Sequence, residues 1–253
     1  MTTKAVQTGN PRVGTDARGD SPRVVVKSVA RQLMTLPEQI AERIFTAIAN
    51  GEYGPGERVR EENLAEQFEV SRGPVREALR ILEKDSVVRI LPNRSAHVTR
   101  LSTQEVSDIF EIRRTLSGLM VSRLSADEAA ALAAAIEADV KALDALAQDA
   151  NGAAGYFETT YRLSRTLREA CGNDRLAEIL ASLARQTLRY TQLGLATPSR
   201  RKESARTWRT LHKGLKTGEL DAAAEAAEKL IEDSRNEAIK QLVARDAAAA
   251  PRD

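Results

Sequence analysis

The chain has 253 residues and a formal net charge of +2, the balance of 38 Lys and Arg against 36 Asp and Glu. A chain of this length can bury one large core or two small ones. Two histidines cannot make a three-histidine zinc site, and one cysteine, Cys171, cannot make a disulfide. Because no apolar run is long enough for a membrane span or a secretory signal, we expect a cytoplasmic protein that does not contact a membrane.

The two ends of the chain differ from the rest in composition. Residues 1–32 show no hydrophobic periodicity and carry six basic against two acidic side chains, a charge of +4. We expect a weakly ordered arm there, which is either solvated or in contact with DNA phosphates. Residues 245–253 are expected to form a tail.

Residues 33–100 carry the signals of three short helices and a hairpin. Apolar residues at every fourth position predict the first helix, and Ser71 is typical of an N-cap before the third. Two β-prone runs around a Pro-Asn-Arg-Ser turn predict the hairpin. This order is that of a winged helix-turn-helix. The predicted elements are 36–48, 61–68, 72–84, 87–91 and 96–99.

After the hairpin only helix signals continue. Ser102 with Glu105, and Ser125 with Glu128, have the spacing of capping boxes. We therefore expect an all-α bundle over residues 101–244. The predicted helices are 102–124, 125–147, 153–171, 174–195, 199–217 and 220–244.

Charge is segregated along the first region. A rotation of 100° per residue places Arg72, Arg76 and Arg80 on one face of the third helix. Residues 72–100 carry seven basic against three acidic side chains, whereas residues 33–100 as a whole carry a charge of −1. This segregation is expected when one helix enters the major groove of DNA, and a solvated charged face is the alternative.

Residues 64–83 follow the pattern LA..F.VSR.PVREAL..LE, which resembles the helix-turn-helix of GntR-type bacterial transcription regulators. The resemblance implies that Ser71 and Arg72 open the recognition helix and that Arg76 reaches a base edge or a phosphate. Ser95 stands where the family commonly has a wing-tip glycine, which disfavours close insertion into the minor groove. His97 is either a base reader or an ordinary polar strand residue. The candidate DNA-binding residues are Ser71, Arg72, Gly73, Pro74, Arg76, Arg80, Arg94, Ser95 and His97.

The helical region resembles the FCD C-terminal domain of the FadR subfamily. Three segments carry this resemblance, Asp108–Arg114, Leu167–Asn173 and Gly218–Ala223. It implies an antiparallel bundle that dimerises or holds a small metabolite and relays its binding to the DNA-binding heads. The fold class expected is thus mainly α, an N-terminal winged helix-turn-helix followed by an all-α antiparallel helical bundle.

Many FCD domains hold a divalent metal through one Asp and three His. The corresponding positions here are Thr160, Ser164, Trp208 and Leu230, none of which is a strong metal ligand. His212 is the only histidine outside the hairpin. We therefore expect neither a metal nor another cofactor.

One charged residue, Arg113, lies in the apolar stripe of the first bundle helix. A buried guanidinium needs an anion, which is either a protein carboxylate or the carboxylate or phosphate of a ligand. Trp208 offers a flat wall for an aromatic or acyl-bearing organic acid. The candidate effector-binding residues are Arg113, Ser117, Tyr156, Thr160, Ser164, Thr187, Tyr190, Trp208, His212 and Ser234.

These patterns predict a DNA-binding transcription regulator, a repressor by the commoner mode of the family. We expect a homodimer that binds a palindromic double-stranded DNA operator and responds to a small organic-acid effector. The alternative is a constitutive DNA-binding dimer whose bundle has lost its effector. An enzyme is not expected, because the sequence shows no Gly-rich phosphate loop and no nucleophile–base pair.

Overall fold

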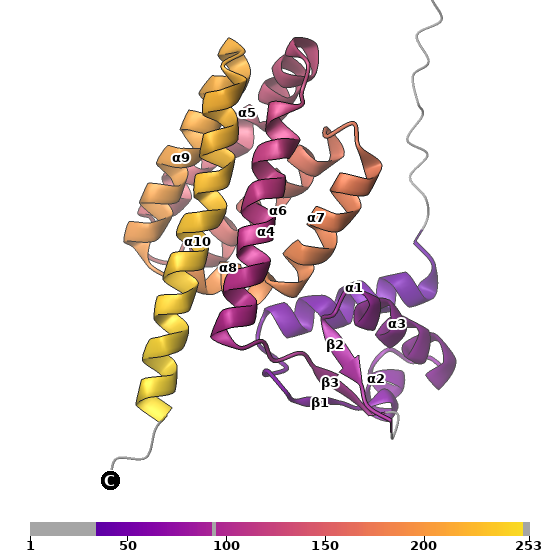
Figure 1. The fold of residues 1–253 in the computed structure, drawn as a ribbon. Helices are drawn as coiled ribbons and strands as arrows, with labels where there is room; N and C mark the ends of the chain where they lie inside the picture. The colour runs from indigo at the N-terminus through magenta and orange to yellow at the C-terminus, as the bar shows by residue number, and fades with distance from the viewer. Residues whose placement is uncertain (1–33, 93–94, 250–253) are drawn as a thin grey trace, which may run out of the picture. The chain divides into compact units, whose positions relative to one another are not determined.

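The computed structural model describes residues 34–92 and 95–249, with side chains up to Arg245. Ten helices and one three-stranded sheet follow one another in these described ranges (Figure 1). The predicted N-terminal arm and Arg94 lie outside them. Within the part that is described, no helix combines the length and the apolar character that a membrane crossing requires.

The first part of the described chain has the elements of a winged helix-turn-helix. Strand β3 lies at the centre of the sheet and pairs antiparallel with both neighbours. The structure adds one strand, β1, that was not predicted, because two residues are too short to show a period of two. The elements are α1 (Leu36–Ala49), β1 (Arg58–Val59), α2 (Glu61–Gln67), α3 (Arg72–Lys84), β2 (Val88–Ile90) and β3 (Ala96–Val98).

The rest of the described chain is helical. The capping boxes predicted at Ser102 and Ser125 are both formed, and Gly218 ends α9 in the left-handed conformation, with φ of 77°. The single helix predicted over 174–195 is instead two helices that meet at Thr187. The helices are α4 (Thr103–Ser122), α5 (Ala126–Gln148), α6 (Ala153–Glu169), α7 (Asp174–Gln186), α8 (Leu188–Gly194), α9 (Pro198–Thr217) and α10 (Leu220–Ala249).

Helix α10 packs along α4 and α9, and α5 packs against α9 and α6 (Figure 1). Contacts between Cα atoms place Thr35–Asp253 in one unit. The bundle core includes a buried charge, Arg201, whose Nη1 donates to the carbonyl of Ala196 at 2.9 Å and whose Nη2 donates to that of Asp149 at 3.3 Å. These carbonyls follow the ends of α8 and α5, so Arg201 satisfies helix-end acceptors that would otherwise be unpaired.

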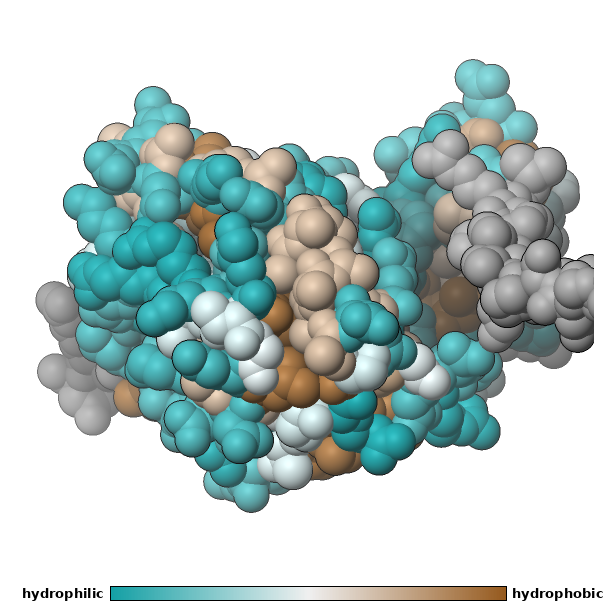
Figure 2. Space-filling model, turned by 90° about the horizontal axis from the view of Figure 1, so that it is seen from above, coloured by the Kyte–Doolittle hydropathy of each residue, from teal (hydrophilic) through white to brown (hydrophobic). Residues whose placement is uncertain are grey.

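The surface is mainly hydrophilic. Seen from above, polar residues cover most of the face shown, and a band of apolar residues runs between them (Figure 2). Among the described residues, the large hydrophobic side chains that remain exposed include Ile112 and Leu119 of α4 and Ile179 of α7. Because α4 and α7 contact each other, these three belong to neighbouring helices.

Candidate DNA-binding surface and effector cavity

Helix α3 separates its apolar and its basic residues. Val75, Ala78, Leu79 and Leu82 are buried in the core, as the helical period predicts. Ser71 is the N-cap residue, although its side chain makes no capping hydrogen bond. Pro74 is half-buried. The exposed candidate residues at this helix are Ser71, Arg72, Gly73, Arg76 and Arg80.

Carboxylates of α2 hold two of the α3 arginines. Arg76 donates to Glu61 from Nη2 at 3.1 Å and from Nε at 3.3 Å, and Arg72 lies 3.2 Å from Glu62. Hydrogen bonding and the negative charge of Glu61 raise the pKa of Arg76. All four side chains reach solvent, so a DNA phosphate or guanine can replace the carboxylates.

The sheet places three basic side chains in a row. His97 of β3 is directly opposite Arg58 of β1 and Arg89 of β2, and both arginines are exposed. Directly opposed residues in antiparallel strands project on the same face. The prediction missed Arg58 because β1 is so short, but Arg89 could have been found from its place in the hairpin.

The hairpin engages two candidate residues internally. Ser95 is only 5% exposed, and its Oγ lies 3.1 Å from Nε2 of His97. Nδ1 of His97 donates to the carbonyl of Gly56 at 3.2 Å. These bonds connect the hairpin to the turn before β1, so both side chains help to shape the wing.

A cavity lies within the bundle between α4, α6, α7, α9 and α10. It consists of two adjoining hollows, both of them partly open to solvent. Most of the walls are apolar, with a few polar groups, which is typical of small-molecule sites. Residues that line both hollows include Arg113, Ser164, Arg168, Trp208 and Leu230.

Arg113 is the most buried charge in this cavity, with 7% of its surface exposed. Its Nη1 donates to Oγ1 of Thr187 at 2.6 Å and of Thr191 at 3.4 Å, and its guanidinium lies 5.0 Å from the centre of the Phe110 ring. No carboxylate among the described residues forms an ion pair with it, so the protein carboxylate weighed above is not found there. Burial lowers the pKa of Arg113 to about 9, with a smaller contribution from the charge of Arg168.

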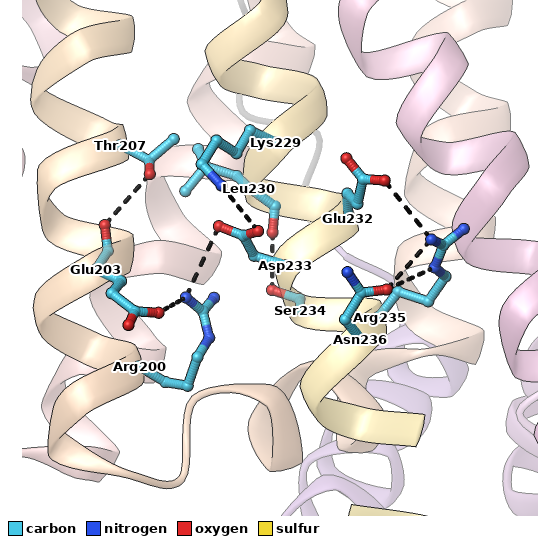
Figure 3. Close-up of polar contacts among 10 residues, drawn as sticks. All are labelled: Arg200, Glu203, Thr207, Lys229, Leu230, Glu232, Asp233, Ser234, Arg235 and Asn236. Carbon is cyan, nitrogen blue, oxygen red and sulfur yellow. Dashed lines mark hydrogen bonds and ion pairs between the residues drawn. The ribbon is translucent and has the colours of Figure 1, made fainter. Parts of the chain in front are cut away.

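Acidic side chains of the neighbouring helices pair with other cations. Figure 3 shows Arg200 of α9 between Glu203, at 2.8 Å, and Asp233 of α10, at 3.8 Å. Asp233 also lies 3.0 Å from Lys229. Ser234, which follows it, donates to the carbonyl of Leu230 at 2.9 Å. Asp233 thus connects α10 to α9, and none of these carboxylates pairs with Arg113.

The structure brings most, but not all, of the predicted effector residues to the cavity. Tyr156 is buried outside its lining. The hydroxyl of Tyr190 accepts from the backbone N–H of Leu101 at 3.3 Å, and Nε2 of His212 lies 3.1 Å from the carbonyl of Ala133. Thr187 reaches the cavity through its bond to Arg113. The predicted residues that line the cavity are Arg113, Ser117, Thr160, Ser164, Trp208 and Ser234.

Arg168 of α6 lines both hollows and was missed from the sequence. Thr160, Ser164 and Arg168 are spaced by four residues, so extending the polar stripe of α6 by one turn would have found it. The described residues include no hydrogen-bond or ion-pair partner for its guanidinium. Burial lowers the pKa of Arg168, and electrostatic interactions with Tyr161 and then Glu169 oppose this in part.

The cavity does not fit a metal ion. The four positions that correspond to metal ligands in the FCD resemblance, Thr160, Ser164, Trp208 and Leu230, all line the second hollow. They supply two hydroxyls, an indole and an aliphatic chain, which do not match the preferences of a divalent cation. In the described ranges, no cluster of three His, Cys, Asp or Glu residues could hold a metal.

The junction of α7 and α8 contacts both the cavity and the winged-helix core. Nη1 of Arg185 lies 2.5 Å from Glu42 of α1, and its Nε lies 3.0 Å from Asp85, which follows α3. Leu188 is buried with the apolar residues of α1, α3 and the sheet. Between them, Thr187 accepts the hydrogen bond from Arg113.

Two family models match the chain. The model described as bacterial regulatory proteins, gntR family, matches residues 36–98, and the FCD domain model matches residues 108–233. An uncharacterized HTH-type transcriptional regulator, YdhC of Bacillus subtilis (strain 168), is 41% identical over 91 residues, which is 36% of this chain and 40% of YdhC. The gluconate operon transcriptional repressor of the same organism is 33% identical over 86 residues, 34% of this chain and 35% of that protein.

Solved structures share the fold. McbR/YncC of E. coli superposes with a TM-score of 0.71 at 18% identity, covering 83% of this chain and 100% of that one. A GntR transcriptional regulator from Rhodococcus sp. RHA1 gives a TM-score of 0.60 at 19% identity, covering 82% and 97%. At such identities these likenesses concern the fold alone.

Proposed function

The chain belongs to the gntR family of bacterial regulatory proteins and is a DNA-binding transcription regulator with an FCD domain, and from this premise we propose how it acts. It is a cytoplasmic protein that represses transcription. It binds a two-fold symmetric operator as a homodimer, and a small organic anion in the bundle cavity changes its DNA affinity. Like the other members of its family, it is a regulator and not an enzyme.

The reading surface proposed for DNA is the exposed face of α3. Its N-terminal residues are open to a phosphate, and Arg72, Arg76 and Arg80 present guanidiniums that suit guanine or phosphate. Arg58 and Arg89 of the sheet extend this basic surface to the neighbouring backbone. A contact between the hydroxyl of Ser95 and a phosphate would require the bond between Ser95 and His97 to open.

The effector part of the proposal depends chiefly on one observation, the buried Arg113 without a carboxylate partner among the described residues. A buried charge that only hydroxyls and a ring contact has a large desolvation cost. An anionic ligand supplies the missing charge. Trp208 contributes an apolar wall for the body of this ligand.

The homodimer is proposed to form through α4 and α7. Ile112 and Leu119 are seven residues apart and therefore on one face of α4, and these two residues and Ile179 of α7 are 50%, 44% and 44% exposed. A second copy of the same face would cover them in an isologous interface. Replacement of Leu119 by Glu should then shift the protein to a monomer in analytical ultracentrifugation, while Val243→Glu on α10 should not.

The operator is tested by selecting duplexes from a random library with the purified full chain. A two-fold symmetric motif is expected among the selected sequences, and gel-shift titration then measures its affinity. A panel of organic acids is next screened for thermal stabilisation and for a change in that affinity. A protein that binds the motif but responds to no acid would be the constitutive dimer weighed above.

A further inference from the structure

We propose that the bundle cavity selects a small dianion through Arg113 and Arg168. The shared chemistry of such ligands is two negative charges on a short apolar body, as in a dicarboxylate or a phosphate monoester. The inference rests on the proposed effector function and adds the charge of the ligand to it.

The two guanidiniums enter the cavity from different helices. Arg113 comes from α4 and Arg168 from α6, and both line each of the two hollows. In the part of the chain that the structure describes, neither forms an ion pair. Arg113 donates to Thr187, whose hydroxyl is neutral. The cavity therefore contains two positive charges and no compensating carboxylate in its lining.

The carboxylate next to Arg168 in the sequence faces away. Glu169 lies 3.4 Å from Arg165, and both of these side chains are more than half exposed. It therefore belongs to a solvated pair on the outer face of α6. An acidic residue on the helix surface does little to offset a charge that lies inside a cavity.

Two like charges in one cavity favour a doubly charged ligand. The charge of Arg168 disfavours the charged form of Arg113 and, after burial, is a cause of the lowered pKa of Arg113. A monoanion neutralises one guanidinium and leaves the other unbalanced. A dianion neutralises both and gives each a charge-assisted hydrogen bond.

The remaining lining limits the body of the ligand. Met120, Leu180 and Trp208 form apolar walls, and Ser117 and Ser164 supply hydroxyls between them. Such walls favour a short hydrocarbon or aromatic body that connects the two charged groups. A sugar or a peptide would leave many of its polar groups unpaired there.

Calorimetric titration of the full-length protein with matched pairs of probes tests this charge selection. The pairs are succinate with butyrate and phthalate with benzoate, and phenyl phosphate distinguishes a phosphate ester from a dicarboxylate. We expect the dianion of at least one pair to bind about tenfold or more tightly than its monoanion, since one added charge-assisted hydrogen bond has this effect.

Variants then assign the second charge. Arg168→Gln should bring the dianion to the affinity of the monoanion, while Arg168→Lys keeps the preference. Arg165→Gln removes the same charge from the outer face of α6 and should leave the preference unchanged. If Arg168→Gln fails to fold, as judged by circular dichroism, Arg168→Met, which keeps an apolar side chain of similar length without the charge, takes its place in the same comparison.

The possible failures are distinguishable. Equal binding of dianions and monoanions by the wild-type protein, or a preference that survives Arg168→Gln, would overturn the dianion site and leave the effector function standing. Binding of none of these probes, together with an unchanged affinity for the selected DNA in their presence, would count against both.

Discussion

Arg113 donates a hydrogen bond of 2.6 Å to Thr187, the residue at which α7 ends and α8 begins. The bond connects the buried charge of the cavity to the break between α7 and α8, and this break lies next to the residues that contact the winged-helix core. Two residues before this break, Arg185 contacts α1, and one residue after it Leu188 enters the same core. A ligand that drew Arg113 away from Thr187 would therefore act on the segment that contacts the winged-helix core.

Replacement of Thr187 by Val should lower the free energy of unfolding by about 1.5–3 kcal/mol, because a buried charged donor loses its acceptor. Urea denaturation measures this loss. Thr115→Val is the matched control, since Thr115 is exposed and its hydroxyl bonds only to a carbonyl of its own helix. Equal losses for the two variants would mean that the bond to Arg113 contributes nothing.

Replacement of Arg76 by Ala should weaken binding to the selected operator by about 1–3 kcal/mol if the guanidinium reads a base. Contact with a phosphate instead would lower affinity for all sequences and reduce the salt slope by about one. Gel-shift titrations over a range of salt concentrations distinguish the two. Arg175→Ala removes an exposed, ion-paired arginine of α7 and should change neither, whereas unchanged binding by Arg76→Ala would remove this residue from the reading face.

Replacement of Arg185 by Gln should loosen α7 from α1. The variant loses two partly exposed ion pairs and a stacking contact with the Phe45 ring at 4.4 Å, which together are expected to contribute about 1–2 kcal/mol. Hydrogen exchange of the α1 amides should become faster. Arg162→Gln breaks a bond to Asp139 inside the bundle and should leave α1 exchange unchanged; equal exchange in both variants would argue against the connection.

Acid should destabilise the protein partly through its capping boxes. Hydrogen bonds from the backbone and side chain of Ser125 lower the pKa of Glu128, so the folded state binds fewer protons than the unfolded state as this group titrates. Its contribution is therefore complete above the unfolded pKa and is lost as the pH falls through the folded pKa. Glu128→Gln should make the decline in urea midpoint below about pH 5 shallower. Glu52→Gln, in an exposed turn, should follow the wild type.

The sequence predicted those features that depend on neighbouring residues. Ser102 and Ser125 cap helices through residues three positions away. The break at Thr187 has no Gly or Pro to signal it. It is stabilised by contacts with Arg113, 74 residues away, which no local pattern contains.

The cavity residues show the same limit. A helical period shows which side of a helix is inward, but several helices share the interior. Tyr190 and His212 were placed inward by this reasoning, and their polar atoms bond to backbone groups outside the cavity lining. Arg168 follows the predicted Thr160 and Ser164 at the same spacing of four residues, and one further step of that spacing would have found it.

The pair of Arg76 and Glu61 makes each DNA contact of this arginine an exchange of partners. Its net gain is the new contact minus the carboxylate bond that is given up. Phosphate and guanine can each offer two acceptors to the guanidinium, as the carboxylate does. The bond to Glu61 would therefore subtract the same free energy from either contact, so that Arg76 would bind DNA only where the new partner offers more than Glu61 does.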